Sequence, residues 1–202
     1  MAMDMLPSDA ELLDRQRALQ MEAEQVARDI MLMELAQPLG DPILVGSAAL
    51  GLMVWRDLDV TVACPRLDVE AVVQVGSRLA LHPRIREVVF RNDTGAWNTD
   101  PAYPDGLYLG LSYRSAGGDD WKSDTWFVDE PDRQPDLAHI ETLPSRLTDE
   151  TRLAILRVKS AWASRPEYGR VVRSFDIYTA VLDGGVRTPD DFAAWLAQRD
   201  DA

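Results

Sequence analysis

The chain has 202 residues, of which 46% are hydrophobic, and its formal net charge is −13. This length and apolar content exclude a disordered chain, and the acidic balance argues against a large nucleic-acid footprint, which needs clustered lysine and arginine. Because Cys64 is the only cysteine, no intramolecular disulfide can form, and we expect a cytoplasmic protein without a signal peptide or membrane anchor.

The first two thirds of the chain predict an α/β (α+β) core built on a mixed β-sheet. Residues Ser8 to Gln37 carry a regular apolar stripe and are expected to form one long amphipathic helix packed on that core. Short apolar segments bounded by glycine, proline and aspartate follow. The expected strands are 43–45, 57–63, 87–90, 107–113 and 122–128, and the expected helices are 48–54 and 67–81.

The last third of the chain predicts helices only. Residues 129–146 are rich in proline and aspartate and are the best candidate for a subdomain boundary. Thr148 is expected to cap a helix that ends near residue 164, a second helix covers 171–182, and Thr188 caps a third. We therefore expect an N-terminal helix in 1–38, an α/β core in 39–130 and a helical C-terminal subdomain in 131–202.

Asp57 and Asp59 lie two residues apart on a predicted strand. Alternate residues of a strand point to the same face, so both carboxylates project together while Leu58 and Val60 point into the core. Two carboxylates this close repel each other unless a cation lies between them. Mg²⁺ or Mn²⁺, which prefer oxygen ligands and substrate phosphates, would resolve the conflict.

Gly46 and Ser47 stand where a predicted strand turns into a helix, a position at which backbone N–H groups can receive a phosphate. Arg56, next to the carboxylates, could contact a phosphate or neutralise Asp57. Each feature alone also has a simpler explanation, namely a turn at Gly46 and a solvated strand edge at the aspartates. Their combination is more specific than either feature.

A buried strand, a Gly-Ser pair, a helix and D-x-D on the next strand together resemble the core signature of the nucleotidyltransferase superfamily, the fold of DNA polymerase beta, poly(A) polymerases and antibiotic nucleotidyltransferases. In that superfamily a later strand supplies a third acidic residue. Asp124, within WKSDTWFV, is the candidate, either as a third metal ligand or as the base that deprotonates the acceptor. The alternative is an exposed residue of an edge strand.

Two segments resemble AbiEii-type nucleotidyltransferases, the toxin components of type IV toxin–antitoxin systems. Residues 46–50 and 56–59 are similar to the G-G-T-A-L and R-x-S-D-D-L-D motifs, and Lys159, Arg165 and residues 173–178 are similar to the later K … R … R-D-x-x-D-x-Y segment. The resemblance implies that Lys159 contacts the triphosphate of a bound nucleotide. It leaves Asp176 three roles: orienting Lys159, acting on the acceptor, or pairing with Arg173.

The function implied is the metal-dependent transfer of a nucleoside monophosphate from a nucleoside triphosphate to a hydroxyl group. The acceptor could be an RNA end, a small molecule or a protein, and an antitoxin would be the partner of a toxin. The segment 151–178, with six basic and two acidic residues, favours RNA, whereas the total charge favours the other acceptors. A nucleotidyltransferase-fold module that binds without catalysing is the alternative.

Overall fold

The computed structural model describes residues 7–200, so residues 1–6 of the predicted segment 1–38 lie outside the described part. Contacts divide the chain into two compact units. A sheet unit comprises Gln20–Gly51 and Arg56–Leu143, and a helical unit comprises, among the described residues, 7–19, Leu52–Trp55 and 144–200. Between residues 7 and 200, no helix has the length and apolar content that crossing a membrane requires.

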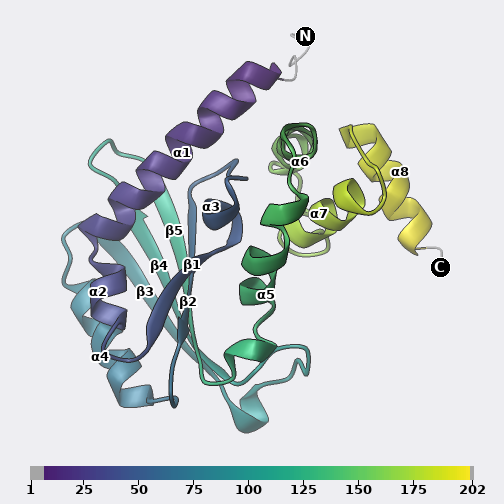
Figure 1. Cartoon of the computed structure of the whole chain (residues 1–202). Coiled ribbons are helices and arrows are strands. Elements are labelled where there is room, and N and C mark those ends of the chain that lie inside the picture. Colours follow the sequence, from purple (N-terminus) through teal and green to yellow (C-terminus); the bar gives the residue numbers. More distant parts are fainter. Residues whose placement is uncertain (1–6, 201–202) are drawn as a thin grey trace. The chain divides into compact units, whose positions relative to one another are not determined.

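The sheet unit contains five strands among its described residues, in the order β1-β2-β5-β4-β3. Figure 1 shows them side by side. The strands are β1 (Asp41–Val45), β2 (Asp57–Ala63), β3 (Ile85–Asp93), β4 (Gly106–Arg114) and β5 (Asp120–Val128). β2 and β5 are parallel, and the other neighbouring strands are antiparallel. All five predicted strands are confirmed, and the mixed sheet agrees with the predicted fold class.

The two faces of the sheet differ in chemistry. In β2, Leu58, Val60 and Val62 are buried, whereas Asp57 and Asp59 are half-buried, as strand alternation predicts. α4 (Val69–Ala80) packs on the apolar face, where a Cβ added to Gly76 would lie 3.1 Å from a Leu109 methyl group. The opposite face carries the aspartates, and we call it the carboxylate face.

Helices of the sheet unit cover parts of the sheet and connect the strands. α3 (Gly46–Leu50) joins β1 to β2, and α2 (Leu32–Ala36) lies next to α4 in Figure 1. The 3₁₀ turns Gly95–Trp97 and Pro131–Arg133 lie in the connections. The connection at 129–146, predicted as a subdomain boundary, contains α5 (Pro135–Thr142), with proline in its first turn where a missing N–H is tolerated.

The long N-terminal helix was predicted as one element, and this is wrong in part. α1 spans Asp9–Asp29, and Met31, with φ 53° in the left-handed region, separates it from α2. A left-handed residue interrupts the hydrogen-bond ladder of a helix. The predicted apolar stripe is nevertheless buried at Leu12, Leu19, Ala23, Val26 and Ile30.

The helical unit is built on α6 (Asp149–Trp162), α7 (Ser174–Leu182) and α8 (Pro189–Asp200), preceded by the 3₁₀ turn Pro144–Arg146. Leu12, Val54 and Leu156 form an apolar cluster within it. The predicted caps are confirmed, because Thr148 accepts a hydrogen bond from the Thr151 N–H and Thr188 accepts one from the Asp191 N–H. The second predicted helix begins later than expected, at Ser174 instead of residue 171.

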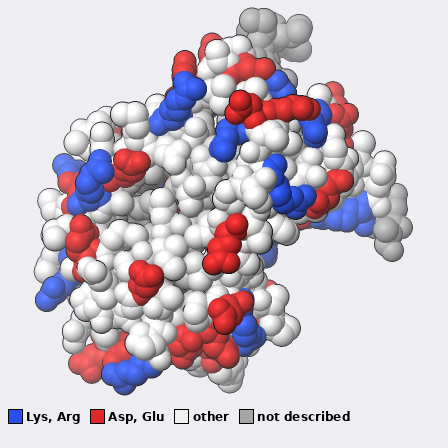
Figure 2. Space-filling view, in the orientation of Figure 1, with Lys and Arg blue, Asp and Glu red and all other residues white. Residues whose placement is uncertain are grey.

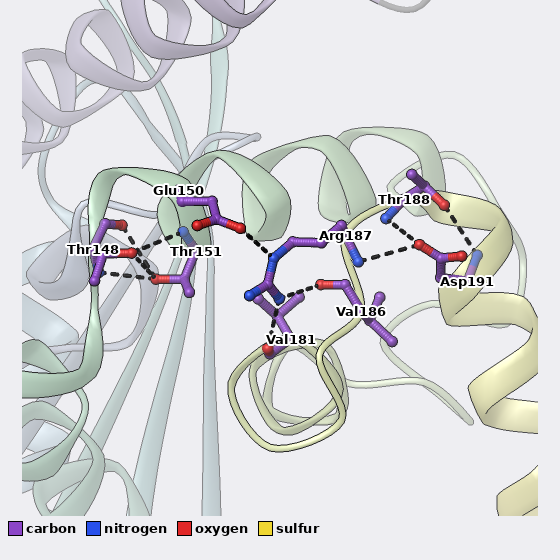
Figure 3. A network of polar contacts seen from close by, with 8 residues as sticks. All are labelled: Thr148, Glu150, Thr151, Val181, Val186, Arg187, Thr188 and Asp191. Carbon is purple, nitrogen blue, oxygen red and sulfur yellow. Dashed lines mark hydrogen bonds and ion pairs between the residues drawn. The ribbon is translucent and has the colours of Figure 1, made fainter.

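Arg187 connects α6, α7 and α8, as Figure 3 shows, and its own N–H donates to Asp191 in the first turn of α8 at 3.3 Å. Its Nε donates to Glu150 in the first turn of α6 at 2.8 Å, and its Nη1 donates to the carbonyl groups of Val181 and Val186. Because these carbonyls belong to the end of α7 and the loop after it, one side chain satisfies acceptors that the helix end leaves without partners in the helix.

Charged side chains of both signs are interspersed on the face of the molecule in Figure 2. Two arginines of the basic segment 151–178 have local partners: Arg157 pairs with Asp9 at 2.7 Å, and Arg165 lies over the Trp162 ring. The positive charge of the segment is therefore partly compensated inside the helical unit.

Candidate active site

Three aspartates converge on the carboxylate face of the sheet unit. Asp57 and Asp59 come from β2 and Asp124 from β5, and Asp59 and Asp124 are directly opposite in the parallel register. One carboxylate oxygen from each lies within 4.8 Å of the other two, and all three residues are half-buried. The structure thus brings together the three carboxylates that the sequence predicts. The alternative for Asp124, an edge-strand residue, is wrong because β5 pairs with both β2 and β4.

Gly46 lies against this group of aspartates. Its φ of +64° is in the left-handed region, and a Cβ at this position would stand 2.2 Å from Asp59 Oδ2. Only glycine combines that backbone conformation with so close an approach to a carboxylate. Ser47 is buried, and Gln20 donates to the Ala48 carbonyl at 2.8 Å, which holds α3 against α1.

Tyr108, on β4, was not predicted from the sequence. Its hydroxyl donates to Asp124 Oδ1 at 2.5 Å. The pKa of Tyr108 is raised far above its ordinary value, first by burial and second by the hydrogen bond to Asp124. No sequence signal links a tyrosine in LYLGLSY to an aspartate sixteen residues later, except the hairpin that pairs their strands.

Arg56 has acidic partners in the sheet unit. Its Nε lies 3.0 Å from Glu22 and its Nη2 lies 3.2 Å from Asp119. These ion pairs join α1, the start of β2 and the β4–β5 hairpin. A contact between Arg56 and a phosphate stays a prediction.

Lys159 lies in the helical unit and is only 1% exposed. Its ammonium donates to the Leu52 carbonyl at 2.9 Å and to the Tyr178 hydroxyl at 3.3 Å, and it lies 5.4 Å from the Trp55 ring centroid. The carbonyl and the rings compensate a buried cation. Lys159 is therefore an interior residue of its unit, and its predicted contact with a triphosphate is not tested by these contacts.

Asp176, the other candidate from the C-terminal part, lies in the first turn of α7. Its carboxylate accepts from the Arg173 N–H at 2.7 Å and pairs with Arg199. Asp176 thus contacts its predicted partner Arg173 through the backbone N–H of Arg173, as the third residue of a helix does in a capping box. Whether Asp176 also has a catalytic role stays a prediction.

The donor set of the three aspartates fits a divalent cation. Three carboxylate oxygens this close together are the hard ligands that Mg²⁺ and Mn²⁺ prefer. Gly46 supports the fit, since any larger residue would displace Asp59 from the group. Asp57, Asp59 and Asp124 are therefore the residues that could hold a metal ion.

Comparisons with known proteins find no matching family model and no matching curated protein, but they find solved structures. The structure of Cid1 with the UTP analogue UMPNPP aligns with 81% of this chain and 48% of its own, at a TM-score of 0.53 and 16% identity. A mutant of the Cid1 poly(U) polymerase bound to MgATP aligns with 85% of this chain and 49% of its own, at 0.54 and 18%.

Cid1 with its short product ApU is also similar, over 87% of this chain and 54% of its own, at a TM-score of 0.53 and 17% identity. The chain spans about half the length of these structures. At such identities the likeness concerns the fold. The mixed α/β fold of this chain is thus shared with these structures, whereas membership of the nucleotidyltransferase superfamily and the AbiEii resemblance stay predictions.

Proposed function

We propose that this protein is a metal-dependent nucleotidyltransferase that moves a nucleoside monophosphate from a nucleoside triphosphate to a hydroxyl acceptor. The observation that carries the proposal is the convergence of Asp57, Asp59 and Asp124 within 4.8 Å. Three like charges at this distance are unfavourable without a cation, so the cluster is better explained by cation binding than by the stability of the fold.

Each residue has a proposed task. In the reaction, the acceptor oxygen forms a bond to the α-phosphorus, the bond from that phosphorus to the pyrophosphate oxygen breaks, and the hydroxyl proton passes to a base. Asp57 and Asp59 would bind Mg²⁺ or Mn²⁺, and Asp124 would be a third ligand or that base. The bound cation would offset the negative charge of the phosphates.

The nucleotide-binding part of the site is proposed at the Gly46-Ser47 turn. This turn lies beside Asp59, so phosphates received there would be close to the three carboxylates. Arg56 and Lys159 are kept as further candidates from the sequence. Lys159 would have to contact the triphosphate while its ammonium stays close to the Leu52 carbonyl.

An RNA end is the acceptor we favour. The similar Cid1 structures hold a UTP analogue, MgATP and the short product ApU, and Cid1 is a poly(U) polymerase, which supports a nucleoside triphosphate and an RNA acceptor for this chain. A toxin role with an antitoxin partner is supported only by the sequence motifs at residues 46–59 and 159–178. Small molecules and proteins are the other acceptor classes to test.

The test is to incubate the protein with each labelled nucleoside triphosphate, Mg²⁺ or Mn²⁺, and either single-stranded RNA or a cell extract. We expect label to appear on RNA with the wild type and not with Asp59→Asn. Label on a protein or metabolite would change the acceptor and keep the chemistry. Nucleotide binding without any transfer would contradict the proposal and favour a binding module.

A further inference from the structure

We infer that Tyr108 is a positioning residue, whose hydroxyl holds the Asp124 carboxylate in the orientation that a third metal ligand needs. The inference rests on the proposed function, because it assigns a task within the same site. Its basis is a contact between neighbouring strands: the Tyr108 hydroxyl donates to Asp124 Oδ1 at 2.5 Å, a short distance typical of a charge-assisted O–H···O⁻ bond.

The position of the hydroxyl follows from the packing of the Tyr108 ring. In the sheet, Tyr108 lies opposite Trp126 of β5 on one side and opposite Arg91 of β3 on the other. The ring centroids of Tyr108 and Trp126 are 5.1 Å apart, and the guanidinium carbon of Arg91 is 4.7 Å from the Tyr108 centroid. Aromatic and cation–π contacts of this kind restrict the orientation of a ring.

Gly110 provides the space that the hydroxyl occupies. A Cβ on Gly110 would stand 2.4 Å from the Tyr108 hydroxyl oxygen and 2.9 Å from Cζ. In the β4–β5 register Gly110 is also the residue opposite Asp124. A glycine at this position therefore lets the tyrosine extend along the strand to the carboxylate.

The physical reason for such a residue is the repulsion within the group of aspartates. Before a cation binds, the charges of Asp57 and Asp59 repel Asp124 and favour rotamers that point it elsewhere. A hydrogen bond from a fixed hydroxyl opposes that rotation. Residues that orient metal ligands in this way commonly contribute about 10-fold to 100-fold to metal affinity or activity.

The experiment compares two variants on the same strand. Tyr108→Phe removes the hydroxyl that donates to Asp124 at 2.5 Å, and Tyr113→Phe removes a hydroxyl that donates to Asp29 at a similar distance, 2.6 Å. Binding of Mn²⁺ alone is measured by electron paramagnetic resonance or calorimetry. We expect Tyr108→Phe to weaken Mn²⁺ binding by about 10-fold or more, and Tyr113→Phe to leave it within about 2-fold of the wild type.

A second variant tests the same hydrogen bond without changing Tyr108 itself. Gly110→Ala would displace the Tyr108 hydroxyl without altering either partner, and we expect the same direction of change. In transfer assays, Tyr108→Phe should lower kcat more than it raises KM for the nucleotide. Circular dichroism and thermal unfolding identify any variant that fails to fold.

The outcomes separate this inference from the proposed function. A wild type that neither binds Mn²⁺ nor transfers nucleotides would overturn both. A wild type that does so, with a folded Tyr108→Phe variant whose Mn²⁺ affinity is unchanged, would overturn the role of Tyr108 alone. Equal losses in Tyr108→Phe and Tyr113→Phe would also overturn it, because the effect would then belong to the sheet as a whole.

Discussion

Two aspartates of the sheet unit each accept a hydrogen bond from a tyrosine of β4, and they differ in the charges around them. Asp29, at the end of α1, accepts from Tyr113 and pairs with Arg84, and His82 Nε2 lies 3.5 Å away. Asp124 accepts from Tyr108 and stands with two further carboxylates.

The difference shows how the same pair of residue types can serve the fold or a site. The pKa of Asp29 is lowered, chiefly by the hydrogen bond from Arg84, so its negative charge is compensated by the chain itself. The group around Asp124 concentrates three like charges instead. At Asp29 the compensating cation is Arg84, a residue of the chain, whereas the site proposed at the three aspartates would take its cation from solution.

The largest effect on activity is expected from a substitution of Asp59. Asp59→Asn should lower nucleotide transfer by about 1,000-fold or more, since it removes a proposed metal ligand, while the protein stays folded or gains slightly in stability from reduced repulsion. Asp29→Asn is the matched control and should keep its transfer activity. Labelled-nucleotide transfer and thermal unfolding measure both properties. Transfer at the wild-type rate by Asp59→Asn would remove the metal site from this face.

Gly46→Ala should have the next largest effect. The added methyl would stand 2.2 Å from Asp59 Oδ2, so we expect Mn²⁺ affinity and transfer to fall by about 10-fold to 100-fold. Gly95→Ala is the control for backbone strain, because Gly95 has a similar φ of +56° and nothing within 4 Å of its would-be Cβ. Similar losses of Mn²⁺ affinity in both variants would show that strain, and not the approach to Asp59, is responsible.

Lys159 is a buried cation whose hydrogen-bond acceptors, the Leu52 carbonyl and the Tyr178 hydroxyl, belong to the chain itself. Lys159→Met should lower the free energy of unfolding by about 1–3 kcal/mol, because the buried Leu52 carbonyl and Tyr178 hydroxyl lose a donor. Urea titration measures this change. The same variant tests the predicted triphosphate contact: a larger loss of affinity for a nucleoside triphosphate than for the nucleoside supports it, and equal changes contradict it.

The smallest effect is expected at Asp29. Asp29→Asn should lower the free energy of unfolding by about 1–2 kcal/mol at pH 7. This range already allows for the partial exposure of the ion pair, which weakens its contribution. Because folding lowers the pKa of Asp29, its contribution is present above the unfolded value of about 3.9 and is lost as the pH falls through the folded value.

Urea titrations of the wild type and Asp29→Asn between pH 7 and pH 3 check this expectation. The difference between the two proteins should be constant at neutral pH and shrink below about pH 4. A difference that stays the same at pH 3 would mean that Asp29 acts through packing and not through its charge.

Local patterns in the sequence were sufficient to predict where much of the candidate site lies. Alternation along β2 places Asp57 and Asp59 on one face, and the Gly-Ser pair after a short strand predicts the turn that lies beside them. The caps at Thr148 and Thr188 were predictable for the same reason, because they depend on residues within one helical turn.

Contacts between distant parts of the sequence needed the structure. The sequence indicates a hairpin of β4 and β5. Strand alternation does not predict that β5 also pairs with β2, which lies far earlier in the sequence. The break at Met31 and the helix α5 in the connection after β5 were missed as well.

By itself, then, the sequence determined the faces of its strands, the caps of its helices and the candidate carboxylates, since those follow from neighbours along the chain. Only the tertiary structure decided that Asp124 stands opposite Asp59, that the Tyr108 hydroxyl donates to Asp124, and that Lys159 is buried. Strand order, register and burial result from packing between segments far apart in sequence, and a local pattern does not specify which segments meet.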